Sequence, residues 1–154
     1  HRPARATIQG VFADAPVDLA FDRREWTITG SVNGFAADLR IDHDDKTIHG
    51  SANGSLVYLA FDWTPERESY KGVANHGAIE YTIDWRAGVV DGSANGSMLH
   101  LEFSLAEGRV DKDLTLDAPS GRLTGTLAGK NVDLTLVNAD LSDFLKNLHL
   151  FLKP

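Results

Sequence analysis

The feature that most constrains the fold of this chain is a phrase that it repeats. The stretch HGSANGSL, which starts at His49, returns as DGSANGSM from Asp91, with a weaker copy, TGSVNGFA, from Thr29. Each copy places Asn-Gly between two short runs of residues. This dipeptide is preferred in two-residue type I′ hairpin turns, because both central residues need a positive φ. The phrase therefore predicts a β-hairpin turn rather than a ligand-binding motif.

A short motif that ends in glycine precedes each turn, and an alternating run follows it. The glycine motif occurs as TIQG at Thr7, TITG at Thr27, TIHG at Thr47, YKG at Tyr70, VVDG at Val89 and RLTG at Arg122. The alternating runs are VDLAFD from Val17, ADLRID from Ala37, VYLAFD from Val57, IEYTID from Ile79, LHLEFS from Leu99 and VDLTLV from Val132. Alternation with a period of two is typical of strands that bury one face. We therefore interpret residues 7–137 as hairpin repeats.

The hairpin interpretation also predicts which residues face each other across a turn. Around Asn53-Gly54, we expect Gly50 opposite Val57 and His49 opposite Tyr58. The same counting around the other turns gives the pairs Gly30–Ala37, Gly72–Ile79, Gly92–Leu99, Asp91–His100 and Gly125–Val132. A slip of one residue would turn the apolar side chains of a strand toward solvent. The agreement of five turns on one register therefore supports the pairing.

We expect one all-β domain over residues 1–154, an antiparallel up-and-down meander of about 12 to 14 short strands. One face of every predicted strand is apolar, so the sheet must bury that face. It can do so by curling into a barrel, round or flattened, or by stacking as a sandwich. The alternative is a β-solenoid, in which the Asn-Gly positions stack from coil to coil. Two-residue turns are too short to round a solenoid corner, so the barrel is favoured.

The last segment, residues 140–152, changes its period and predicts an amphipathic helix. Its apolar face consists of Leu141, Phe144, Leu145, Leu148 and Leu152, and Asp140 precedes it as a cap. A barrel of about 12 strands is wider than its own side chains readily fill, since about eight strands already give an interior of that size. We therefore expect the helix to plug or cover the barrel and to pack against the recurrent glycines, which are Gly10, Gly30, Gly50, Gly72, Gly92 and Gly125.

Composition limits the partners and the location. The net charge of −7 leaves no clustered basic face for a nucleic acid, and no apolar run is long enough to span a membrane. The absence of cysteine excludes disulfides and thiol catalysis. The chain begins with His1 rather than methionine, which we interpret as processing after export. The expected location is therefore periplasmic or secreted, from a bacterium.

Groups that might carry chemistry are few. The stretch DHDD, Asp42 to Asp45, offers carboxylates and an imidazole, but it lacks the spacing and the glycine of a calcium loop, so we interpret it as a solvated turn. The predicted pair of Asp91 and His100 faces outward with no nucleophile evident beside it. No catalytic or nucleotide-binding motif occurs in the chain. We expect no enzyme activity, no cofactor and no metal.

The tryptophans are the most suggestive residues. Trp26, Trp63 and Trp85 all fall at predicted strand ends on the rim that carries the longer charged loops, with Arg86 beside them. Indole beside charged groups can stack on a sugar and hydrogen-bond it, and the alternative is that the rings close the end of the barrel. We predict a non-enzymatic, exported binding or structural module that contacts a protein or glycan at this rim. The alternative function is a carrier of a lipid or other apolar ligand inside the barrel.

Overall fold

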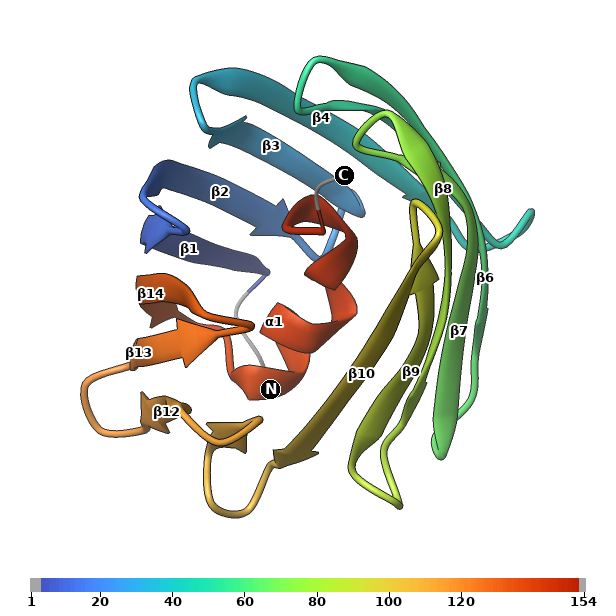
Figure 1. The fold of residues 1–154 in the computed structure, drawn as a ribbon. Helices are drawn as coiled ribbons and strands as arrows, with labels where there is room; N and C mark the ends of the chain where they lie inside the picture. The colour runs from blue at the N-terminus through green and yellow to red at the C-terminus, as the bar shows by residue number, and fades with distance from the viewer. Residues whose placement is uncertain (1–3, 153–154) are drawn as a thin grey trace.

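A computed structural model describes residues 4–152 as a closed antiparallel barrel (Figure 1). Within these residues fourteen strands follow one another around the barrel in chain order, and β1 pairs with β14 to close it. The strands are β1 (Arg5–Phe12), β2 (Ala15–Asp22), β3 (Thr27–Val32), β4 (Phe35–Asp42), β5 (Thr47–Ala52), β6 (Ser55–Trp63), β7 (Arg67–Ala74), β8 (Gly77–Asp84), β9 (Val89–Ala94), β10 (Ser97–Ser104), β11 (Arg109–Val110), β12 (Leu114–Asp117), β13 (Arg122–Leu127) and β14 (Lys130–Val137). The predicted meander and barrel are confirmed, and the solenoid alternative is wrong.

The turns have the register that the sequence predicts. Gly50 lies opposite Val57, and His49 lies opposite Tyr58. The pairs predicted around the other four turns are also present. The first residue of each turn, such as Asn53, has a positive φ near 54°. The repeated phrase therefore defines the hairpins, as expected.

The barrel interior is the hydrophobic core. Inward residues of successive strands are almost fully buried, among them Ile8, Leu19, Ile28, Leu39, Ile48, Leu59, Ile79, Leu114, Leu123 and Leu134. Each such side chain contributes about 1.5–3 kcal/mol through the apolar area it removes from water. The residues between them, such as Asp18 and Asp38, face solvent. The period-two pattern of the sequence thus separates the core from the surface.

The recurrent glycines allow the backbone of the adjacent strand to come close, and they do not make room for the helix. All six have φ between 131° and 159°. A Cβ atom at Gly10 would overlap the backbone carbonyl of Asp133, and one at Gly30 would overlap that of Asp18. The nearest atoms are therefore those of the adjacent strand, not those of the helix that we expected there. Only glycine fits these positions, because an L side chain would collide with the neighbouring backbone.

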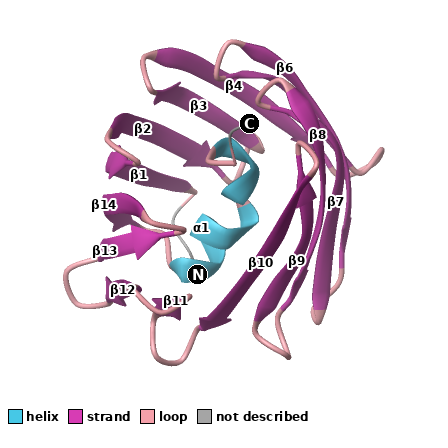
Figure 2. Ribbon diagram, viewed as in Figure 1, coloured by secondary structure: helices cyan, strands magenta, loops and turns pink. Residues whose placement is uncertain are grey.

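The C-terminal segment lies inside the barrel, as Figure 2 shows. The predicted helix over residues 140–152 is in fact two short pieces, α1 (Leu141–Lys146) and the 3₁₀ turn η1 (Leu148–Leu150). Asp140 caps α1 and Asp143 completes a capping box. The break falls at Asn147, whose side chain donates to the carbonyl of Asp143. The residues after the break, 149–152, reach the turns that hold Asn53 and Asn75.

The side chains that we predicted for the plug are buried. The exposed fraction is 2% for Leu141, zero for Phe144 and Leu145, and 1% for Leu148. Phe151, which follows η1, stacks on Phe144 with ring centroids 5.4 Å apart. The helix therefore supplies the apolar volume that a wide barrel lacks. No helix within residues 4–152 has both the length and the apolar character needed to cross a membrane.

Candidate functional site

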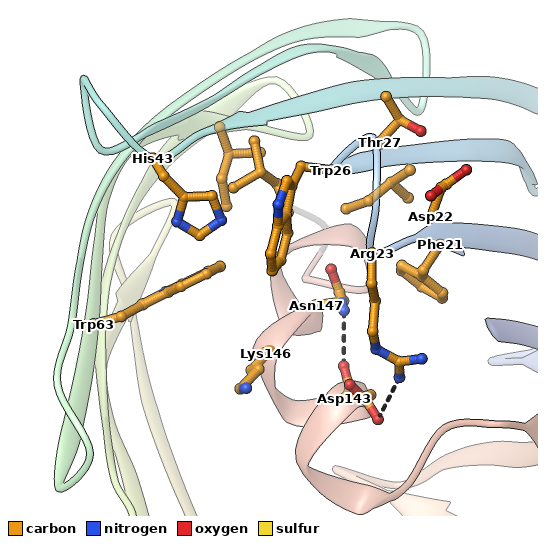
Figure 3. Close-up of a pocket in the computed structure, with 13 residues that line it drawn as sticks. Phe21, Asp22, Arg23, Trp26, Thr27, His43, Trp63, Asp143, Lys146 and Asn147 are labelled. Carbon is orange, nitrogen blue, oxygen red and sulfur yellow. Dashed lines mark hydrogen bonds and ion pairs between the residues drawn. The ribbon is translucent and has the colours of Figure 1, made fainter. Parts of the chain in front are cut away.

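A cavity of about 290 Å³ lies between the rim of the barrel and the end of α1 (Figure 3). We call it the rim pocket. Its lining comes from strands β2 to β6, from the β2–β3 and β4–β5 loops and from the C-terminal segment. The residues are Phe21, Asp22, Arg23, Trp26, Thr27, Ile28, Ile41, His43, Ile48, Trp63, Asp143, Lys146 and Asn147. Most of the wall is aromatic or aliphatic, and the polar groups lie where the helix meets the rim.

Three rings form the aromatic wall of the rim pocket. The imidazole of His43 packs edge-on against Trp26, with ring centroids 4.2 Å apart, and against Trp63 at 5.3 Å. Trp63 stacks in turn on Phe61 at 4.3 Å. Trp26 is 40% exposed and His43 is also exposed, whereas Trp63 is half-buried. Edge-to-face contacts of this kind hold the rings in fixed orientations, so the wall is preformed.

The loops of this rim share one local construction. The aspartate that ends a strand, such as Asp22 or Asp42, accepts hydrogen bonds from the backbone amides two and three residues further along the chain. These backbone donors, with Glu25 first, lower the pKa of the Asp22 carboxyl. The loop then closes with a residue of positive φ. The stretch DHDD is therefore a turn, as we interpreted it, and its aspartate oxygens satisfy backbone rather than a ligand.

Trp26 occupies the closing position of its loop, with φ at 57°. The equivalent position is Lys46 in the β4–β5 loop and a glycine in three further loops of this rim, namely Gly88, Gly108 and Gly121. The β6–β7 loop, residues 64–66, has no residue of positive φ. A positive φ costs a residue with a side chain about 1–2 kcal/mol relative to glycine. A bulky tryptophan at such a position is an outlier that calls for an explanation.

The helix contributes the polar side of the rim pocket. Asp143 pairs with Arg23 at 3.2 Å, and its carbonyl accepts from the side chain of Asn147 at 2.8 Å, both drawn in Figure 3. The Nζ atom of Lys146 lies 5.9 Å from the centre of the Trp63 ring. Donors and acceptors thus face the aromatic wall across the cavity.

A buried carboxylate adjoins this site. Glu68 is 5% exposed, and its two oxygens accept from the Tyr70 hydroxyl at 2.9 Å and from the Trp85 indole at 3.0 Å. Lys146 lies 3.9 Å away. The indole of Trp63 donates to Tyr70 at 3.0 Å, which links the network to the aromatic wall. Burial raises the pKa of Glu68, although Lys146 and the two donors oppose this effect.

The structure brings together two of the four binding residues proposed from sequence. Trp26 and Trp63 line the rim pocket. Trp85 lies outside it, where its indole donates to Glu68 and its ring packs edge-on against Phe103 at 5.6 Å. Arg86 also lies outside it and is exposed, 3.9 Å from Glu66. Trp85 is therefore a partly buried residue packed against the core and is not part of the rim pocket.

Sequence reasoning missed His43 and Lys146 as pocket residues and Glu68 as the centre of the network. His43 was noticed only as one member of DHDD. A lone glutamate at the start of a strand carries no signal of burial, and Lys146 reaches the rim only because the helix folds into the barrel. Among residues 4–152, no group of three or more histidine, aspartate or glutamate side chains is placed to hold a metal ion.

No family model, no curated protein and no solved structure matches this chain. The functional argument therefore depends on the geometry of the site alone.

Proposed function

We propose that the protein is an exported, non-enzymatic binding module whose rim pocket receives a small group with one flat apolar face and polar edges. A sugar ring at the end of a glycan has this chemistry, because its C–H face stacks on indole while its hydroxyls meet charged groups. The volume of about 290 Å³ lies at the lower end of the range for ligand pockets. It suits one such ring rather than an extended ligand.

Trp26 is the observation that carries the proposal. Trp26 has a positive φ at a loop position that is glycine in three equivalent loops, and its side chain is partly exposed. The backbone conformation costs about 1–2 kcal/mol, and the 40% of the residue that stays exposed leaves part of its surface open to the cavity and to solvent. Strain of this kind persists at functional sites, where the side chain serves a ligand. We therefore assign to Trp26 the face on which the ligand stacks.

The state of the carboxylates supports binding without catalysis. Glycoside hydrolysis uses two carboxyl groups about 5–9.5 Å apart on either side of the bond. In the rim pocket, Asp22 already accepts backbone hydrogen bonds and Asp143 pairs with Arg23. Glu68, whose pKa is raised, is bonded to Tyr70 and Trp85 and does not line the cavity. Neither an acid nor a base is held ready for a substrate.

The filled interior supports the rim over the carrier alternative. A carrier needs an internal space for its ligand, and here Phe144 and Leu145 occupy the middle of the barrel with no exposed surface. Extraction of natively purified protein with organic solvent, followed by mass spectrometry, tests this point. A stoichiometric lipid in the extract would favour the carrier and argue against the rim pocket as the main site.

The direct test is titration with a panel of neutral and acidic mono- and disaccharides, followed by tryptophan fluorescence and saturation-transfer NMR. We expect at least one member to bind, and the variant Trp26→Gly to lose that binding. Lys46→Gly is the matched control, because it gives the same backbone change at the equivalent loop position without removing a ring. Loss of binding in both variants, or in neither, would contradict the proposal.

A further inference from the structure

The barrel wall is incomplete beside β10. The two strands that follow it are much shorter than their neighbours, since β11 has two residues and β12 has four. On that side β10 pairs only through Phe103 and Ser104. Within residues 4–152, its first half, from Ser97 to Leu101, has a strand partner on the β9 side alone. The short β11–β12 hairpin therefore leaves an open strand edge in an otherwise closed barrel.

The backbone pattern identifies which groups face this opening. In other hairpins, the carbonyl of the second residue of the strand after a turn accepts from the backbone N–H of the first residue of the next turn. The carbonyl of Pro16 accepts from Asn33 in this way, and that of Ala78 accepts from Asn95. Met98 is the equivalent residue on β10. On β10 the amide of the next turn, that of Asp111, donates to the carbonyl of Glu102 and not to that of Met98. In an antiparallel ladder alternate residues face the same side, so the amides and carbonyls of Met98 and His100 point into the opening.

An apolar cavity of about 270 Å³ lies at the same place, and we call it the wall cavity. Leu99 and Leu101 line it from β10, Leu127 from β13, and Phe151 from the C-terminal segment. Met98 stands beside it with 92% of its surface exposed, the highest value among the exposed large apolar residues of the described chain. A side chain that points inward from an added strand would enter this cavity.

The outer face of the opening is acidic. His100 is hydrogen-bonded to Asp91, and Glu102 lies 3.9 Å from the other nitrogen of the imidazole. The hydrogen bond that the His100 imidazole donates to Asp91 is the largest cause of the raised pKa of His100, and the charges of Asp91, Glu102 and Asp111 add to it. The carboxylates of Asp91, Glu102 and Asp111 therefore attract positive charge beside β10, whereas Lys130, at the start of β14, lines the wall cavity from the β14 side. Two copies of this chain would bring the same acidic groups together, which disfavours self-pairing.

We propose that the open edge of β10 and the wall cavity bind an extended peptide segment that alternates apolar and basic residues. The peptide runs antiparallel to β10, along the course that a longer β11 would take. Its backbone bonds to Met98 and His100, its apolar side chains enter the wall cavity, and its basic side chains face Asp91, Glu102 and Asp111. Strand addition to an exposed sheet edge is a general mode of peptide recognition. This site is separate from the rim pocket and does not depend on its function.

The test uses the whole chain and a capped peptide of about seven residues that alternates lysine with valine and leucine. Binding is measured by calorimetry, and the site is located by amide hydrogen exchange. We expect the amides of Met98 and His100 to become protected on binding. The amide of Leu99, which faces β9, is expected to change little. Unchanged exchange at Met98 and His100 in the presence of saturating peptide would overturn the proposal.

Variants separate the backbone contribution from the side chains. Met98→Pro removes the outward N–H without breaking a bond to β9, and proline is tolerated on such an edge. We expect it to lower affinity about tenfold or more, while Met98→Ala, which keeps the N–H, loses much less. Asp111→Asn should lower affinity a few fold and weaken its dependence on salt. Equal affinity of Met98→Pro and Met98→Ala would contradict strand addition.

Two further measurements keep the test decisive. If Met98→Pro does not fold, the unmodified protein is titrated with the peptide methylated at the backbone nitrogens that face β10, and the expected result is loss of binding. Undiminished binding of the methylated peptide would overturn the proposal. Sedimentation of the protein alone gives the other check: a dimer that Met98→Pro dissociates would assign the edge to a second copy and reject the peptide.

Discussion

The two ends of the barrel hold the same C-terminal segment in different ways. At the end formed by the Asn turns, the segment is clasped by side chains of the turns themselves. Asn75 donates to the carbonyls of His149 and Leu152, and Asn53 donates to Asn75 and to the carbonyl of Leu150. At the tryptophan end, Lys146 approaches the buried Glu68 and the rim pocket stays open.

The difference shows that one turn position can serve two purposes. Asn33 and Asn75 both have φ near 55° at the start of a hairpin turn, but Asn33 is exposed and Asn75 is 1% exposed. Only the turns that lie next to the C-terminal segment bind it with the side-chain amides of their asparagines. Side-chain amides at one end are thus used for stability, while the other end keeps an exposed ring and a cavity.

The largest effect should come from breaking the clasp. Asn75→Ala removes three buried hydrogen bonds, each worth about 1–1.5 kcal/mol, so we expect the free energy of unfolding to fall by about 4 kcal/mol. Asn33→Ala is the control, because it changes the same residue at the same φ without a clasp, and it should cost less than about 1 kcal/mol. Urea denaturation measures both. Equal losses would mean that the turn conformation matters and the clasp does not.

The second effect is the pH response of the clasped end. His149 is completely buried, and burial lowers its pKa from 6.5 to about 4. The unfolded chain takes up a proton near pH 6.5 while the folded chain does not, so stability is full above pH 6.5 and is lost as pH falls toward 4. The loss should approach about 3 kcal/mol. We expect His149→Leu to abolish this part of the pH dependence in urea titrations, and His49→Leu, on the outer face, to preserve it.

The tryptophan end should respond to pH with the opposite sign. The folded pKa of Glu68 is raised above its ordinary value of 4.5. Its contribution to stability is therefore complete below about pH 4.5 and is lost as pH rises through the folded value. The stability difference between the wild type and Glu68→Gln should shrink over that interval. Glu66→Gln, at an exposed position, should leave the profile of the wild type unchanged, and a parallel profile for Glu68→Gln would refute the assignment.

The smallest effect on stability is expected at the rim pocket. Trp26→Gly removes a partly buried ring, which lowers stability, and relieves a positive φ, which raises it, so the two effects largely offset and the free energy of unfolding should fall by only about 1 kcal/mol. Thermal unfolding measures this shift. A loss above about 3 kcal/mol would show that Trp26 closes the barrel and does not serve a ligand. Ligand binding in the same variant gives the complementary measurement described above.

Much of the fold could be predicted because its rules are local. Asn-Gly at Asn53 defines a two-residue turn, and alternation after it assigns each side chain to one face, so the register follows by counting. The recurrent glycines were recognised as special, but their role was not, because the close approach of the neighbouring backbone is visible only once that strand is in place. The helix was predicted too long, since Asn147 breaks it through a contact made within α1.

The candidate site was predicted only in part. Trp26 and Trp63 could be found from sequence, because exposed loops that hold tryptophan are unusual. His43, Lys146 and Glu68 could not be found from sequence. His43 joins the site through the neighbouring loops, and Lys146 joins it through the position of the helix. Glu68, on β7, is buried because β7 pairs with β8 and so meets Trp85, which follows β8. The separation of Trp85 from the other tryptophans has the same cause, because its indole is held by Glu68 from an adjacent strand.

The sequence by itself determined the hairpins, their register and the apolar interior, because turn chemistry and side-chain alternation act over a few residues. Only the tertiary structure decided how the barrel closes, which asparagines clasp the C-terminal segment, and where the wall is left open beside β10. Those features depend on the relative lengths of strands that meet around the barrel and on the place of the helix inside it. Such relations arise from packing across the whole chain, and no local pattern encodes them.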